Sequence, residues 1–112
     1  LATDVAGGSH ESMLHAITHA IQASKLRWRL YDETVKPLSF ERAFYLATMG
    51  GGAFFGKVGS FLPGYAFDAV VLDDTTLDHP QQLSVRARLE RAAYLADDRN
   101  LAAKFVAGKK IL

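Results

Sequence analysis

The stretch Thr3-Asp4-Val5-Ala6-Gly7-Gly8 sets a carboxylate and two glycines between a short apolar lead and a long helical pattern. The lead, residues 1–2, has the character of the end of a strand. Glycine adopts positive φ freely, so Gly7-Gly8 permits a tight turn and a close approach of the backbone to a ligand. A carboxylate at the carboxyl end of a strand, just before a helix, is where α/β folds place catalytic groups. Asp4 is therefore either a site residue or one of the aspartates that commonly stabilise turns.

Length and composition limit the classes of protein to which the chain can belong. The chain has 112 residues, of which 49% are hydrophobic, enough for a packed core. Lys and Arg number 13 and Asp and Glu 12, so the net charge of +1 indicates neither a nucleic-acid nor a membrane partner. There is no cysteine, which excludes disulfides and cysteine-based zinc sites and is compatible with a reducing compartment. No apolar run approaches the ~18 residues that span a bilayer.

The first residues of the sequence bear on whether the chain is part of a longer protein. There is no initiator methionine, and only three residues precede Asp4. A strand usually has about five or six residues, so this lead is too short to hold Asp4 by itself. We expect the chain to be the C-terminal portion of a longer protein.

Two helices are predicted in the first half. The first covers residues 9–30, with Ser9 as its N-cap and apolar residues at spacings of three and four on one face. The second begins after Ser39 and ends at Gly50. The run of three glycines at 50–52 lacks the GxxxxGK[ST] pattern of a phosphate-binding loop, so we predict a helix terminator followed by close packing. One further helical turn is predicted at residues 53–56.

In the second half of the chain, the spacing of the apolar residues is no longer that of a helix. A turn at Pro63-Gly64 leads to a predicted strand over Phe67–Leu72. Residues 81–96 return to a helical pattern, and residues 105–112 form a predicted hairpin around Ala107-Gly108. The charged side of the predicted helix is interpreted as a solvated face, because no aromatic residues alternate with its arginines. That face consists of Arg86, Arg88, Glu90 and Arg91.

The histidines are weak candidates for a metal site. His10-Glu11 begins like the HExxH zinc motif, but Leu14 stands where the second histidine is required. His15 and His19 are four residues apart and could share a metal on a helix face, although no third ligand is placed beside them. His79, before a proline, is interpreted as structural or solvated. Catalytic zinc takes about three protein ligands, so the chain alone does not contain a complete metal site.

The order of the motifs adds an independent line of reasoning. Matching stretches run along the whole chain: Thr3–Gly8, Ser12-Met13-Leu14, Ala43–Thr48 with Gly50-Gly51, Gly59-Ser60-Phe61, Phe67-Asp68-Ala69, Tyr94-Leu95, Asp97–Asn100 and Val106–Lys109. Taken in this order they strongly resemble the C-terminal end of the guanine deaminases, within the metal-dependent amidohydrolases. The first stretch and the YLxDDRN stretch are specific to guanine deaminases, whereas the Gly-Gly and Phe-Asp-Ala elements occur more widely in amidohydrolases.

The resemblance implies an α/β fold class. Residues 1–56 would form the C-terminal end of a (β/α)8 barrel, comprising the end of strand 8 and the helices that follow it. Residues 57–112 would form part of the accompanying β-sandwich, with a flanking helix.

The resemblance also implies a reaction. Asp4 matches the family's zinc-binding aspartate, which is also the catalytic residue that moves protons during hydrolysis of guanine to xanthine and ammonia. The other zinc ligands, the proton-donating glutamate and most purine contacts would lie upstream, so no substrate-binding residue is assigned here. The intact enzyme would be a cytoplasmic homodimer with guanine as its small-molecule partner, and the segment alone would be inactive.

Other readings stay open. The chain could belong to another amidohydrolase deaminase or chlorohydrolase that acts on a different heterocycle, or it could be a non-catalytic α+β binding module. Two positions depart from the family pattern: His10 stands where a hydroxyl residue is common, and Ala2 replaces a glycine. His10 either alters substrate contacts near the mouth of the site or is a tolerated change at a helix start.

Overall fold

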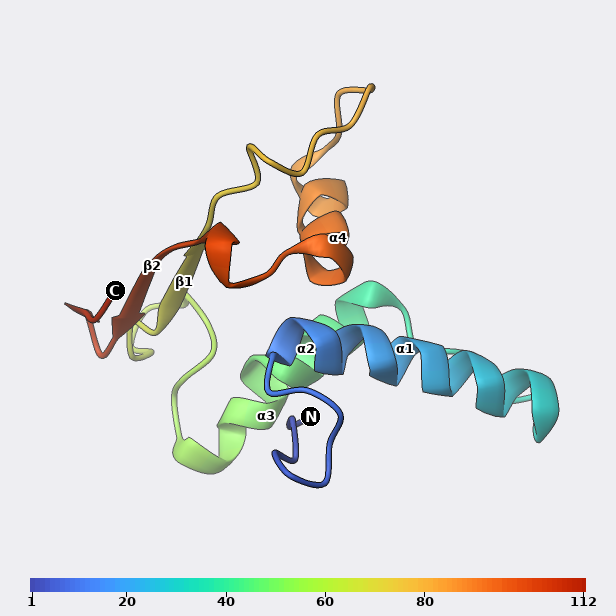
Figure 1. Cartoon of the computed structure of the whole chain (residues 1–112). Coiled ribbons are helices and arrows are strands. Elements are labelled where there is room, and N and C mark those ends of the chain that lie inside the picture. Colours follow the sequence, from blue (N-terminus) through green and yellow to red (C-terminus); the bar gives the residue numbers. More distant parts are fainter.

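The computed structural model describes residues 1–112 as a mixture of helices and a small sheet (Figure 1). The helices are α1 (Met13–Leu30), α2 (Phe40–Ala47), α3 (Met49–Gly52) and α4 (Val85–Leu95), with 3-10 turns at Ala53–Phe55 and Asp98–Asn100. The strands are β1 (Ala69–Leu72), β2 (Leu101–Val106) and β3 (Lys109–Lys110). None of the helices is both long and apolar enough to cross a membrane.

Helix α1 starts later than predicted. Its N-cap is Ser12 and not Ser9, because the Ser9 hydroxyl is hydrogen-bonded to Nδ1 of His19, 3.2 Å away on α1. The backbone N–H of Ser12 donates to Nδ1 of His10 at 3.0 Å. The segment before α1 therefore folds back along the first turns of the helix instead of extending it.

Helix α2 begins as predicted, since the Ser39 hydroxyl accepts the N–H of Arg42 at 3.2 Å. The prediction that Gly50 ends the helix is wrong. The break lies at Thr48, whose hydroxyl donates to the Phe44 carbonyl at 2.9 Å, and α3 then continues through all three glycines. The predicted close packing is confirmed: a Cβ on Gly50 would lie 2.9 Å from the Tyr45 ring.

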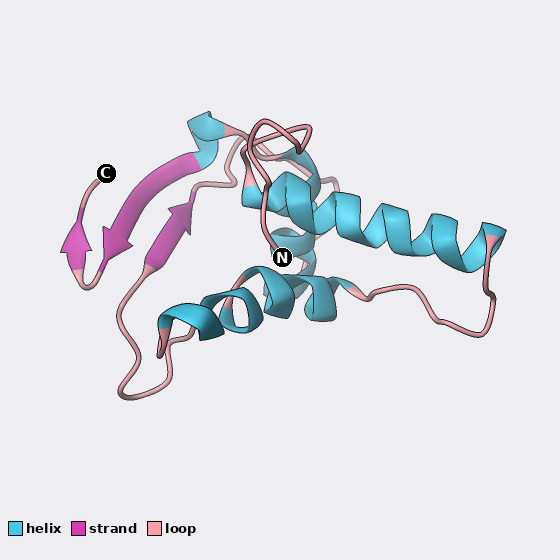
Figure 2. Ribbon diagram, turned by 90° about the horizontal axis from the view of Figure 1, so that it is seen from below, coloured by secondary structure: helices cyan, strands magenta, loops and turns pink.

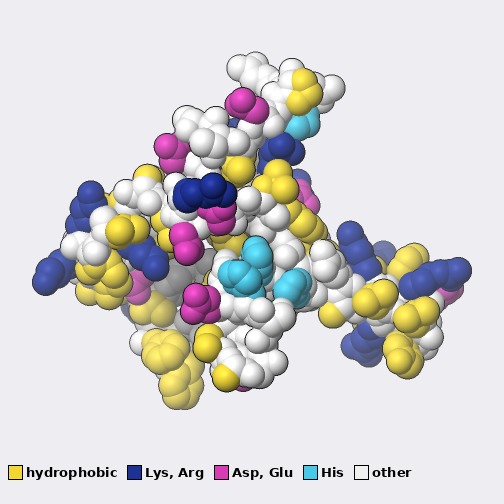
Figure 3. All heavy atoms as spheres, in the orientation of Figure 1, with side chains coloured by type: hydrophobic (Ala, Val, Ile, Leu, Met, Phe, Trp, Pro, Cys, Tyr) yellow, Lys and Arg dark blue, Asp and Glu magenta, His cyan; other side chains and the backbone are white.

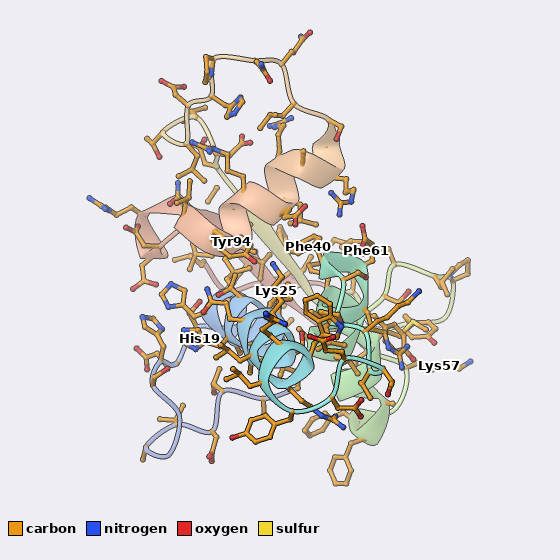
Figure 4. The ribbon with its side chains drawn as sticks, turned by 90° about the vertical axis from the view of Figure 1, so that its right-hand side faces the viewer. His19, Lys25, Phe40, Lys57, Phe61 and Tyr94 are labelled. Atoms are coloured by element: carbon orange, nitrogen blue, oxygen red, sulfur yellow. The ribbon has the colours of Figure 1, made fainter.

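The core forms where α1, α2 and α4 meet (Figure 2). Its buried members are four small or branched apolar side chains and one aromatic ring: Ile17, Ile21, Ala43, Ala93 and Phe40. Alanines at the contacts let the helices approach closely while Phe40 fills the remaining volume (Figure 4). Most of the apolar residues predicted along one face of each helix therefore face the core, but Val85 at the start of α4 is 77% exposed.

The sheet is antiparallel in the order β1-β2-β3, with Ala69 paired to Phe105 and Val106 paired to Lys109. The predicted first strand is present but begins at Ala69, two residues late. The predicted hairpin at Ala107-Gly108 is confirmed, although its second strand is Lys109–Lys110 and not residues 111–112. Both turn residues have positive φ, +47° and +80°, as tight hairpin turns require.

The charged side of α4 is more than the solvated face that the sequence predicted. Arg88 binds both carboxylate oxygens of Asp74, at 2.7 and 2.8 Å, and Arg91 donates to the carbonyl oxygen of Asp78 at 2.7 Å. Arg86 bridges from α4 to Glu41 on α2 and lowers the pKa of that carboxyl to about 2. These arginines hold the loop between β1 and α4 and tie α4 to α2.

Asn100 connects the sheet to this loop. It is buried, its side-chain amide donates to the Asp73 carbonyl at 2.8 Å and to the Thr76 hydroxyl at 3.1 Å, and its side-chain oxygen accepts the Asp97 N–H at 3.0 Å. Because buried polar groups must be paired, no apolar residue could replace it without leaving these groups unsatisfied. The asparagine of the YLxDDRN stretch thus has a structural role.

The stabilisation contributed by the neighbouring Asp97 is expected to depend on pH. Hydrogen bonds from the Arg99 guanidinium, and then from the Arg99 backbone N–H, lower the pKa of Asp97 from 3.8 to about 2. Since the folded-state pKa is depressed, the stabilisation is present above about pH 3.8 and is lost as the pH falls toward 2. We expect carboxyl-carbon NMR to show Asp97 titrating near 2, and R99Q to move its pKa upward. An unchanged midpoint in R99Q would contradict the assigned cause.

The segment is open for its size. Its Cα radius of gyration is 15.3 Å, against about 13 Å for a compact domain of this length. Its accessible surface is 8207 Å², whereas a compact monomer of this mass exposes about 6,100 Å². Large apolar side chains at the far end of α1 and after α3 are exposed, Tyr31 by 86% and Phe54 by 89% (Figure 3).

Candidate functional site

The turn that carries Asp4 lies at one edge of the molecule, between the start of α1 and the α2–α3 corner (Figure 1). The backbone nitrogen of Leu1 lies 3.1 Å from the Leu46 carbonyl oxygen, so the first residue described is next to this corner. No strand among the 112 residues pairs with residues 1–2, so the expectation that they end a strand of a barrel stays a prediction. The only β-type pairing here is an isolated bridge between Val5 and Gly8.

The backbone of the turn differs from the sequence prediction in one respect. The residues with positive φ are Asp4 at +51° and Ala6 at +78°, and not Gly7 or Gly8. The Asp4 carbonyl oxygen accepts the N–H of Gly7 at 2.9 Å and also the N–H of Gly8. A non-glycine residue held in this region costs about 1–3 kcal/mol, and such residues gather at functional sites.

The glycines are needed for space. A Cβ on Gly8 would lie 1.9 Å from the Thr3 carbonyl oxygen, so the backbone on the two sides of the turn is in direct contact. A Cβ on Gly7 would lie 2.6 Å from Oδ2 of Asp4. This close approach joins two parts of the turn itself, and the expected approach of the backbone to a ligand stays a prediction.

The Asp4 carboxylate is exposed and belongs to none of the five ion pairs. The N–H groups of the turn point at the Asp4 carbonyl oxygen, so its side chain is not used to close the turn. A free, exposed carboxylate suits a hard or borderline cation such as zinc. It would be one ligand of several, because no group of three or more metal-binding side chains exists in the chain.

The histidines gather on one face around the start of α1, with His79 apart on the loop before α4 (Figure 3). The ring centroids of His10 and His15 are 4.0 Å apart, and those of His15 and His19 are 6.1 Å apart. The metal site considered for His15 and His19 lacks a third ligand in the structure. His10 has a local role instead, since its ring accepts the Ser12 N–H at the helix start.

Comparison with known proteins identifies the family to which the chain belongs. Residues 1–111 match the profile of the Amidohydrolase family, and the chain belongs to this family. Its similarity within the family is to guanine deaminases. The structure superposes on the guanine deaminase of C. acetobutylicum, crystallised with guanine in the active site, with a TM-score of 0.92 and 44% identity over 98% of this chain. The guanine deaminases of Dictyostelium discoideum and Homo sapiens are each 34% identical to it, over 99% and 100% of this chain.

The chain covers only a small part of each of these relatives. The chain spans about a quarter of the length of these relatives: 26% of the Clostridium structure, 26% of the Dictyostelium protein and 27% of the human protein. These relatives are therefore about four times as long as the 112-residue chain.

Proposed function

We propose that this chain is the C-terminal part of a zinc-dependent guanine deaminase, which hydrolyses guanine to xanthine and ammonia. One observation carries the proposal. The strained turn around Asp4 presents a free carboxylate, and it does so in a segment that superposes on a guanine deaminase crystallised with guanine in its active site. The motif order, with TDVAGG near one end and YLxDDRN near the other, supports the same family.

In this proposal Asp4 has two roles. Its carboxylate would be one ligand of a zinc ion, and the remaining ligands would come from polypeptide outside this chain. Zinc supplies the positive charge that brings the pKa of water from about 15.7 to near 7. Asp4 would accept a proton from the attacking water, aim its oxygen at the carbon bearing the amino group, and pass a proton to the departing ammonia.

The same proposal divides the chain. Residues 1–56, which contain α1 to α3 and the Asp4 turn, would complete the catalytic barrel, and residues 57–112 would add the β1-β2-β3 sheet and α4 to the neighbouring β-sandwich. The exposed apolar side chains at the end of α1 and after α3 are compatible with surfaces that the remaining polypeptide covers.

The test is a substrate comparison with the full-length protein. Ammonia release is measured with guanine, with other aminopurines and with aminotriazines, and chloride release is measured with chlorotriazines, all at equal concentration. We expect kcat/KM for guanine to exceed the others by at least about 10², since a site built to hydrogen-bond one substrate rejects analogues that leave its polar groups unpaired. Preferential turnover of a triazine would instead assign the chain to another amidohydrolase. No turnover of any of them by zinc-loaded protein would favour a binding module.

A further inference from the structure

The carboxylate of Asp4 lies directly over the Cα of Gly7. A Cβ built on Gly7 would be 2.6 Å from Oδ2, 3.2 Å from Cγ and 3.5 Å from Oδ1 of Asp4, so all three nearest atoms belong to that one carboxylate. The φ of Gly7 is not positive, so Gly7 does not lie in the left-handed region that favours glycine. Glycine is required at this position only by the space that the carboxylate occupies.

We propose that Gly7 is a positioning residue: its lack of a side chain lets the Asp4 carboxylate adopt the orientation that the reaction uses. The inference rests on the proposed function, because it assigns Gly7 a role through Asp4. Any side chain at position 7 would fill the place of Oδ2 and turn the carboxylate away. Gly7 itself touches neither substrate nor metal.

Gly8 provides the contrast within the same turn. A Cβ on Gly8 would strike backbone, at 1.9 Å from the Thr3 carbonyl oxygen and 3.1 Å from the Asp4 carbonyl oxygen. Backbone atoms cannot move aside without opening the turn, so G8A should destabilise it. The atoms facing Gly7 are the end of one flexible, exposed side chain, which can rotate at little cost.

The expected displacement is large on the scale of catalysis. Ordinary contact with a Cβ begins at 3.4 Å, so in G7A the carboxylate oxygen must retreat by about 0.8 Å. A misplacement of about 1 Å can cost a factor of 10² in rate, because reacting groups must be held in near-attack geometry. G7A should therefore preserve folding while weakening the function of Asp4.

The experiment uses the full-length enzyme as wild type, G7A, D4N, the double variant and G8A. We measure kcat and KM for guanine, zinc affinity by competition with a chelator, and the melting temperature of the zinc-free protein. For G7A we expect kcat to fall about 10- to 100-fold, KM to stay within about twofold and zinc affinity to fall, with the melting temperature unchanged. For G8A we expect the melting temperature to fall.

The double variant separates a positioning role from a general one. If Gly7 acts through the carboxylate, adding G7A to D4N should leave the zinc affinity of D4N unchanged. Equal losses of zinc affinity in both backgrounds would overturn the inference. Wild-type kcat and zinc affinity in G7A, or a melting temperature as low as that of G8A, would also overturn it. No guanine turnover by the zinc-loaded wild type would refute the proposed function itself, and normal activity of D4N would refute the role proposed for Asp4, whatever G7A does.

Discussion

Replacing Asp4 with asparagine in the full-length enzyme is expected to lower kcat for guanine by about 10²–10⁴, the usual contribution of a positioned acid or base. Asparagine has the same shape as aspartate and tolerates the left-handed conformation that residue 4 adopts at φ +51°. The turn should therefore persist, and the variant should lose the proton acceptor and the negative charge toward zinc. The measurements are steady-state ammonia release and bound zinc per subunit.

Asp98 provides the matched control for this substitution. It is also an exposed aspartate without an ion pair, but it lies in the 3-10 turn after α4. D98N should keep both wild-type kcat and wild-type zinc content. Near-normal turnover in D4N would remove Asp4 from the mechanism, and an equal loss in D98N would show that the effect is not specific to the site.

The three helices that form the core were predictable because their apolar residues repeat at three and four positions. In α1, α2 and α4 most of these periodic residues face one shared core, with Val85 of α4 as an exposed exception. Helix ends were less predictable, because they depend on contacts between distant residues. The Ser9 hydroxyl pairs with His19 and so does not cap α1, and the Thr48 hydroxyl bonds the Phe44 carbonyl and breaks the helix before Gly50.

The sequence predicted which residue is the candidate and that it lies in a turn, but it did not predict the backbone conformation of the turn. The sequence marks Asp4 and the two glycines, yet the positive φ values belong to Asp4 and Ala6. Alanine carries no signal for that conformation, which the surrounding turn imposes. The roles of Arg88 and Arg91 were missed for a similar reason, since their partners lie 14 and 13 positions away along the chain.

The 112-residue chain produced alone is expected to retain zinc poorly and to associate with itself. Asp4 supplies one carboxylate, and no other metal-binding side chains join it to make a group of three. Structural zinc sites with full ligand sets bind with about 10–16 kcal/mol, so we expect a single ligand to bind at least about 10³-fold more weakly than the full-length enzyme does. Only nine residues are buried, and the accessible surface exceeds that of a compact monomer of this mass by roughly 2,000 Å².

That excess resembles the area of a specific protein–protein interface, about 1,200–2,000 Å² in total, so the exposed apolar surfaces should drive association. Sedimentation velocity over a concentration series measures the association, and chelator competition measures zinc affinity with the full-length enzyme as reference. Adding purified remaining polypeptide should reduce self-association and raise zinc affinity, because it supplies both the covering surface and the missing ligands. A monomeric chain that binds one zinc ion tightly would contradict the prediction, since 112 residues would then complete a site that we infer to be shared with the rest of the enzyme.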